Sequence, residues 1–260
     1  MEISLSRAGY CSQRAWFADR SAFTRQIRFP AMIAHIKHPS LGRVLFDAGY
    51  GSALIDAKSI GARLYKRGLP FVLPDNERVT ANIDRIFLSH YHPDHIGGLR
   101  DVPGAPPILC SRDGLARLRS LRGIALHRAA FFPELLPDDF EARSLAIEDL
   151  PLTKGIGPFE AGFDVAGDGS LIAIPLRGHA AGQYGLLCDR RVFLCADSAW
   201  LRTNIVDRRW PAWPVRALVD DYSSFTQTLD KLHVLSKSHP EIQIIPSHCE
   251  ESIAAYGKHV

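Results

Sequence analysis

The chain has 260 residues, of which 46% are hydrophobic and 23% charged, and this is enough to bury one large core. We therefore expect a single domain over residues 1–260. The formal net charge of +3 is too small to indicate a nucleic-acid-binding surface, so we expect no nucleic-acid partner.

Charged side chains are scattered through the first 23 residues, which argues against a signal peptide or a membrane-spanning helix there. The five cysteines are an odd number without a CxxC pair, a pattern that favours reduced thiols over a disulfide framework. Together these features predict a cytoplasmic protein with no membrane partner and a small-molecule substrate. They do not indicate an oligomeric state.

Short apolar runs bounded by glycine, proline and polar residues predict strands along most of the chain. Helical spacing of apolar residues predicts helices at 112–121 and 222–235. Between the early strands and the next buried run lies a long, partly apolar insertion at 52–79. The predicted strands are 3–6, 31–36, 42–47, 83–89, 159–165, 171–176, 183–188, 191–197 and 242–248.

The strongest chemical signal follows the buried run 83–89, where three imidazoles and one carboxylate stand within six positions. In an extended chain alternate side chains share a face, so His90, His92 and Asp94 would point the same way. Pro93 turns the chain, and His95 then leaves in another direction. Two groups of ligands aimed at neighbouring points suit two metal ions about 3.5–4 Å apart that share a water.

Three later predicted strands also end in metal-ligating residue types. His179 follows the strand at 171–176 with glycines close on both sides, and Asp197 and His248 end the strands at 191–197 and 242–248. A buried carboxylate such as Asp197 has to be paired or metal-bound. We therefore expect these three residues to complete the site begun at His90.

The segment His90-Tyr91-His92-Pro93-Asp94-His95 matches the HxHxDH motif, and from about Asp47 to His248 the chain resembles the metallo-β-lactamase-fold hydrolases. The resemblance implies an α+β fold, a four-layered αββα sandwich with the site along one edge of the two sheets. It gives Asp47 the role of orienting the metal ligands. It places one metal ion on His90, His92 and His179, the other on Asp94, His95 and His248, and Asp197 between the two as a bridge.

Nitrogen and oxygen donors without thiolate favour two zinc ions, and iron or manganese suit the same donor types. Two such ions supply hydroxide near neutral pH, which attacks a carbonyl carbon. Asp94 is the expected catalytic residue, because a carboxylate there can receive the proton and deliver it to the leaving group.

The segments around His179 and Asp197 look most like those of the dinuclear zinc N-acyl-homoserine lactonases. Those enzymes have a tyrosine three residues after the bridging aspartate, where this chain has Trp200, whose indole donates a hydrogen bond but transfers no proton. We therefore predict a metal-dependent hydrolase that opens a lactone or related carboxylic ester, with a quorum-signal lactone as one candidate. In the related hydrolases an insertion at this place often forms the wall of the substrate pocket, so Tyr65 and Phe71 are expected to bind substrate, with an ordinary amphipathic helix as the alternative. Trp200 is the third expected substrate-binding residue, with core packing as the alternative.

Four other interpretations stay open. A thioester hydrolase of the glyoxalase II type uses the same seven ligands, and a mononuclear iron persulfide dioxygenase, an oxidoreductase, has similar ligand spacing. A ribonuclease or phosphodiesterase keeps the motif but needs a basic surface for its substrate. A non-catalytic metal-binding module is the fourth.

Overall fold

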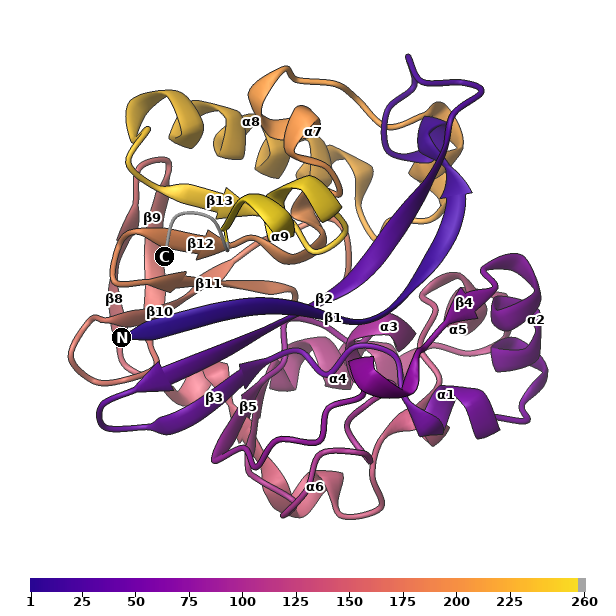
Figure 1. Cartoon of the computed structure of the whole chain (residues 1–260), viewed down its shortest axis with the longest axis horizontal. Coiled ribbons are helices and arrows are strands. Elements are labelled where there is room, and N and C mark those ends of the chain that lie inside the picture. Colours follow the sequence, from indigo (N-terminus) through magenta and orange to yellow (C-terminus); the bar gives the residue numbers. More distant parts are fainter. Residues whose placement is uncertain (257–260) are drawn as a thin grey trace.

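Two β-sheets packed face to face form the centre of the computed structural model, which describes residues 1–256 (Figure 1). The larger, seven-stranded sheet has the strand order β4-β1-β2-β3-β5-β6-β7. Its strands are β1 (Glu2–Arg14), β2 (Gln26–His38), β3 (Gly42–Phe46), β4 (Phe71–Val72), β5 (Arg85–Phe87), β6 (Ile108–Cys110) and β7 (Ser144–Ala146).

The second, six-stranded sheet has the order β13-β12-β11-β10-β9-β8. Neighbours are antiparallel except β12 and β13, so β10, β12 and β13 all run in the same direction. Its strands are β8 (Leu152–Ile156), β9 (Phe159–Asp164), β10 (Leu171–Pro175), β11 (Tyr184–Cys188), β12 (Val192–Leu194) and β13 (Gln243–Ile245).

Helices cover the outer faces of both sheets (Figure 1). None of the helices within residues 1–256 is long and apolar enough to cross a membrane. The helices are α1 (Ser52–Asp56), α2 (Ile60–Gly68), α3 (Pro93–Ile96), α4 (Arg112–Ser120), α5 (Gly123–Arg128), α6 (Phe140–Arg143), α7 (Arg202–Val206), α8 (Tyr222–Ser238) and α9 (Glu250–Tyr256).

Alternate residues of the strands pack either in the central core between the two sheets or in the outer cores between a sheet and its helices. In β3, Phe46 points into the core between the sheets, whereas Leu45 points to the helices on the other side. Phe87 of β5 stacks on Phe46 with ring centroids 5.7 Å apart, and Leu186 of β11 lies in the same core. Because successive strand residues face opposite sides, strands apolar on both faces are buried between two layers.

The six-stranded sheet has its own outer core with α8. Phe193 of β12 packs there with Leu229, Leu232 and Leu235, which recur at helical spacing and are at most 2% exposed. Burial of each such side chain stabilises the fold by roughly 1.5–3 kcal/mol. On the opposite side of the molecule, α1 to α4 pack on the larger sheet. The predicted αββα sandwich is therefore confirmed.

The first hairpin is much longer than the sequence predicts. β1 extends from the predicted residues 3–6 to Arg14, and β2 begins at Gln26 instead of residue 31. The hairpin passes beyond the rest of its sheet (Figure 1), and there Cys11, Ile27 and Phe29 pack in one small apolar cluster. A bulge at Gly9, which has φ +85°, shifts the register between the two halves of the hairpin.

The insertion at 52–79 is folded rather than a loose loop. It contains α1, α2 and the two-residue strand β4, which pairs with β1 through Phe71 and Cys11. α2 is amphipathic, because Ala62 is buried whereas Arg63 and Arg67 are exposed. β4 brings Phe71 to the edge of the sheet beside the predicted site.

Candidate metal centre

Seven imidazole and carboxylate groups converge at one edge of the sandwich because the strands that carry them end there. The parallel strands β3 and β5 put their carboxyl ends at the same edge, and β10, β12 and β13 do so in the other sheet. The residues beyond these ends are His90, His92, Asp94 and His95 after β5, His179 after β10, Asp197 after β12 and His248 after β13.

The chain changes direction inside the motif at Pro93, which is the first residue of α3, with His92 as its N-cap. Proline suits this position because the first helical N–H has no partner in the helix and φ is already fixed. One turn later Gly98 lies against the backbone of Ala48, where a Cβ atom would collide with the carbonyl oxygen of that residue. The tight turn thus places Asp94 and His95 directly beside the end of β3.

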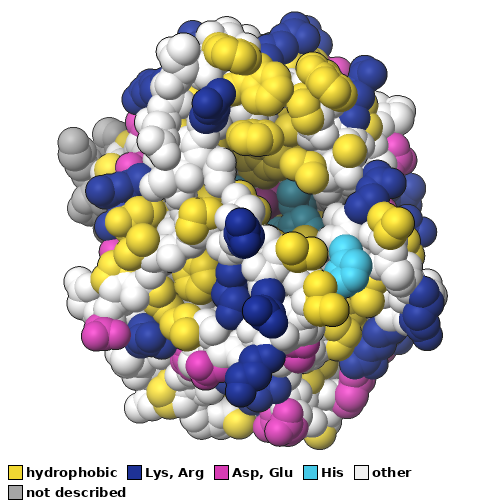
Figure 2. Space-filling model, turned by 90° about the vertical axis from the view of Figure 1, so that its right-hand side faces the viewer, with side chains coloured by type: hydrophobic (Ala, Val, Ile, Leu, Met, Phe, Trp, Pro, Cys, Tyr) yellow, Lys and Arg dark blue, Asp and Glu magenta, His cyan; other side chains and the backbone are white. Residues whose placement is uncertain are grey.

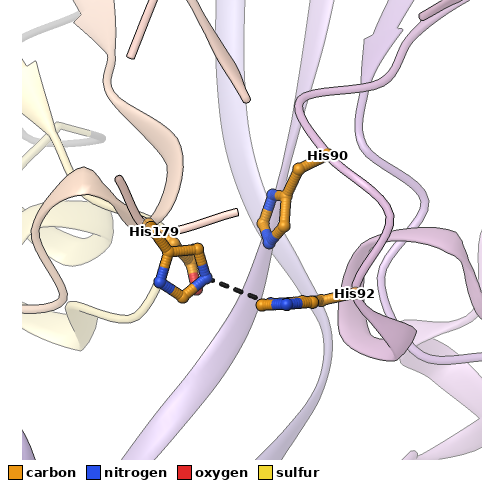
Figure 3. Close-up of side chains that lie close together, drawn as sticks. His90, His92 and His179 are labelled. Carbon is orange, nitrogen blue, oxygen red and sulfur yellow. Dashed lines mark hydrogen bonds and ion pairs between the residues drawn. The ribbon is translucent and has the colours of Figure 1, made fainter. Parts of the chain in front are cut away.

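The first group of donors is formed by His90, His92, His179 and Asp197, whose ligand atoms all lie within 4.8 Å of one another. Figure 3 shows the three imidazoles pointing toward one another from the two sheets. The ring centroids of His90 and His92 are 4.6 Å apart, and Nδ1 of His92 lies 3.0 Å from Nε2 of His179. Several lone pairs aimed at one point are the arrangement of a metal site.

The second group consists of Asp94, His95 and His248, again within 4.8 Å. Asp197 connects it to the first group. Its Oδ2 atom lies 2.9 Å from Nε2 of His248 and 3.4 Å from Nε2 of His179, while its Oδ1 atom lies 3.3 Å from Nε2 of His95. One carboxylate therefore faces both groups.

Hydrogen bonds behind the cluster fix the orientation of the imidazoles. The carboxylate of Asp47 accepts from the backbone N–H of Ser89 at 2.7 Å and from its hydroxyl at 2.8 Å, and it lies 2.7 Å from Nδ1 of His95. Nδ1 of His248 lies 2.7 Å from the carbonyl oxygen of Pro30. With Nδ1 engaged in this way, the Nε2 atom of each ring faces the cluster.

Several inward-facing atoms of the cluster are buried without a hydrogen-bond partner among residues 1–256, namely Nε2 of His90, Nε2 of His95 and Oδ1 of Asp197. A buried polar group without a partner costs about 1–3 kcal/mol. Metal ions would satisfy these atoms, and the imidazole and carboxylate donors are of the kind that binds zinc, iron or manganese. The residues present therefore fit a pair of divalent ions.

Burial and the charges in the cluster shift the pKa values of the imidazoles in opposite directions. Burial lowers the pKa of His179 to about 3, and burial together with the neighbouring imidazoles lowers that of His90. Burial also opposes the charge of His95, but the carboxylates of Asp47, Asp197 and Asp94 outweigh it and raise the pKa of His95 well above its usual range. The first group thus contains neutral imidazoles, the form that binds a metal ion.

Comparison with protein families gives one match, to the family described as the metallo-beta-lactamase superfamily, over residues 38–248. This range includes the motif and every strand end described above. The chain belongs to the metallo-β-lactamase superfamily. Comparison with curated protein sequences gives no match.

Solved structures share the superfamily fold at low sequence identity. A variant of AiiA from B. thuringiensis, with N-decanoyl-L-homoserine at its active site, is 17% identical, with 97% of this chain and 95% of that chain covered and a TM-score of 0.71. An N-acyl homoserine lactone hydrolase with N-hexanoyl-L-homoserine at its metal centre is 16% identical, with coverages of 97% and 95% and a TM-score of 0.71. AidC, a dizinc quorum-quenching lactonase, is also 16% identical, with coverages of 96% and 90% and a TM-score of 0.63.

Two of the three expected substrate residues lie together beside the superfamily motif. The indole of Trp200 is edge-on to His179, with ring centroids 6.0 Å apart. Trp200 and Phe71 pack on one small apolar cluster with Cys11 and Phe29. These four residues form a partly buried apolar wall next to the imidazoles.

Tyr65 lies in the helical layer instead, where its ring is edge-on to Phe132 at 5.8 Å. Burial raises the pKa of its phenol well above the usual range, and the carboxylate of Asp94 adds to the effect.

Sequence reasoning missed two residues that adjoin the cluster. The hydroxyl of Ser89 donates to Asp47 and also lies 3.0 Å from Nδ1 of His90. Its position directly before the motif is the sequence feature that could have identified it. Phe29 lies edge-on to His248 with centroids 6.3 Å apart. No local pattern marks Phe29, because its position depends on the long hairpin of β1 and β2.

Proposed function

We propose that the protein is a metal-dependent hydrolase that opens a lactone or a related carboxylic ester. The observation that carries this proposal is the position of Asp197, whose carboxylate lies 3.4 Å from His179 in the first group of donors and 3.3 and 2.9 Å from His95 and His248 in the second. Superfamily membership supports the same conclusion.

In this proposal His90, His92 and His179 would hold one ion, Asp94, His95 and His248 would hold the other, and Asp197 would contribute to both. The donor set suits zinc, and we propose two zinc ions as the resident cofactor. Two divalent ions in such a site lower the pKa of a shared water towards neutrality and polarise a carbonyl group.

The exposure of Asp94 and its distance from His248 support a role as proton carrier. Its side chain is 14% exposed, whereas that of Asp197 is 4% exposed, and its Oδ2 atom lies 3.6 Å from Nε2 of His248. We assign to Asp94 the uptake of the proton from the attacking water at a carboxylate oxygen. The same oxygen then gives this proton to the alkoxide that leaves when the C–O bond of the ester or lactone breaks.

The substrate side of the proposal rests on the apolar wall formed by Cys11, Phe29, Phe71 and Trp200. The indole N–H of Trp200 is a donor for a carbonyl or ring oxygen of the substrate, and Phe71 supplies apolar contact. Lactone opening is favoured within the ester class because similar structures contain N-acyl-L-homoserines at their active sites or metal centres. A small molecule is the proposed substrate.

Replacement of donors tests the proposal. His92→Ala and Asp197→Ala should lose bound metal, measured by elemental analysis, together with hydrolysis of a panel of lactones and carboxylic esters. The same panel should include a glutathione thioester and a measurement of oxygen consumption. Turnover by either variant at the wild-type rate, or activity confined to the thioester or to oxygen uptake, would contradict the proposed function.

A further inference from the structure

A cleft opens directly beside the first group of donors, on the side of α4 and α5. Its volume is about 190 Å³, and both His92 and His179 line it. Residues 217–220 form the opposite side, where the backbone N–H of Asp220 donates to the carbonyl oxygen of His179 at 3.0 Å. This wall is therefore tied to the backbone that carries one of the imidazoles. On the molecular surface, Figure 2 shows histidines at the bottom of a hollow with hydrophobic side chains around its rim.

The walls of the cleft are mostly apolar, with Leu118, Leu121 and Leu218 among the lining residues. A cavity of about 150 Å³ admits benzene, so this cleft has room for a group of about six to eight non-hydrogen atoms. A ten-carbon acyl chain exceeds that size. The cleft thus suits a short group attached to the reacting carbonyl or to the leaving oxygen.

Two guanidinium groups line the same cleft, and they differ in their partners. Nη2 of Arg117 lies 2.7 Å from Oδ1 of Asp220, so its charge is neutralised. Arg128 donates through Nε and Nη2 to the carbonyl oxygen of Ala217 at 3.3 and 3.2 Å. No ion pair between Arg128 and a carboxylate occurs within residues 1–256, and a guanidinium has five N–H donors. Arg128 therefore presents an unneutralised positive charge to the cleft.

From this geometry we infer that the cleft binds the non-reacting part of the substrate and that Arg128 pairs with a carboxylate on it. The substrate class is a short lactone or ester that carries a second, anionic carboxyl group. This inference rests on the proposed function and specifies its substrate. Arginine suits the role because its planar guanidinium makes charge-assisted, bidentate hydrogen bonds with a carboxylate.

Two lactones that differ only in whether the second carboxyl group is a carboxylate or an amide test the inference in the zinc-loaded enzyme. We expect kcat/KM for 5-oxotetrahydrofuran-2-carboxylate to exceed that for its primary amide at least tenfold. Arg128→Met should abolish this preference without loss of bound zinc. Arg122→Met is the matched control, since Arg122 lies between α4 and α5, outside the cleft lining, and bonds to the carbonyl oxygen of Leu121. Equal rates on both substrates, or a preference that persists in Arg128→Met, would overturn the inference.

Binding of a non-hydrolysable pair separates this inference from the proposed function. Titration calorimetry of the zinc-loaded protein should give at least tenfold tighter binding of glutarate than of glutaramide, and Arg128→Met should remove the difference. If the difference is present and no lactone or ester is hydrolysed, the cleft inference stands and the proposed function fails. If lactones are hydrolysed but glutarate binds Arg128→Met and the wild type equally, the proposed function stands and the cleft inference fails.

Discussion

Nδ1 of His95 lies 2.7 Å from Oδ2 of Asp47, and neither side chain has any exposed surface. Asp47 has φ 58°, a left-handed conformation that asparagine also tolerates, so Asp47→Asn changes the charge without new backbone strain. The amide group would leave one of the three hydrogen bonds of Asp47 unmade, and His95 would lose its fixed orientation. We expect Asp47→Asn to lower zinc affinity about 10–100-fold, measured by competition with a chelator. Unchanged affinity would show that Asp47 does not orient His95.

The pH dependence of zinc binding follows from the opposite pKa shifts of the imidazoles. Burial opposes the charge of His248, but Asp197 and Asp94 raise its pKa above the ordinary 6.5, and the carboxylates do the same for His95. These two rings therefore hold protons above pH 6.5 in the metal-free protein, whereas His90 and His179 are already neutral.

Zinc must displace the protons on His95 and His248, so zinc affinity should rise as the pH increases from 6.5 through their raised pKa values. The protonated rings stabilise the metal-free fold at pH values below 6.5, and this stabilisation is lost as the pH rises through the raised pKa values. Chelator competition between pH 6 and 8.5 and proton release during calorimetric titration in two buffers measure the effect. A pH-independent affinity with no proton release would contradict the assignment.

The indole of Trp200 lies beside His179, with ring centroids 6.0 Å apart. Trp200→Phe keeps an aromatic ring but removes the indole N–H, which is the hydrogen-bond donor of this side chain. We therefore expect kcat/KM on lactones to fall about 3–10-fold. Trp200→Tyr restores a donor and should recover part of the loss. Trp213→Phe is the control, because Trp213 is 76% exposed. Equal kinetics of Trp200→Phe and the wild type would restrict Trp200 to packing.

The sequence was sufficient for the parts of the fold that depend on local patterns. The apolar runs predict β3, β5 and β10 to β13, and the seven donors stand at the ends of these strands, where parallel direction brings them to one edge. The periodicity of Leu229, Leu232 and Leu235 predicts α8 in the same way.

Features that depend on distant contacts were not predictable. The hairpin of β1 and β2 continues to Arg14, where backbone pairing and a small apolar cluster around Cys11 and Phe29 hold the strands together. Phe71 and Trp200, which pack against this cluster, come from distant parts of the chain. The cleft beside His179 combines α4 and α5 with residues 217–220, which lie far from these helices in the sequence and share no motif with them. The sequence around Arg128 does not distinguish it from an ordinary surface arginine, and only the fold brings it to the cleft.

Gly178 precedes His179 and has φ +116°, and a Cβ atom at this position would overlap the backbone of Phe225 in α8. We expect Gly178→Ala to lower the free energy of unfolding by about 2–4 kcal/mol, from backbone strain and displacement of α8, and to weaken zinc binding because His179 moves. Urea unfolding and zinc competition measure the two effects. Gly167→Ala is the matched control, since Gly167 has φ +79° with open space around it and should show about 1 kcal/mol of strain without loss of zinc. If the two variants have equal stability and zinc affinity, the contact with Phe225 does not position His179.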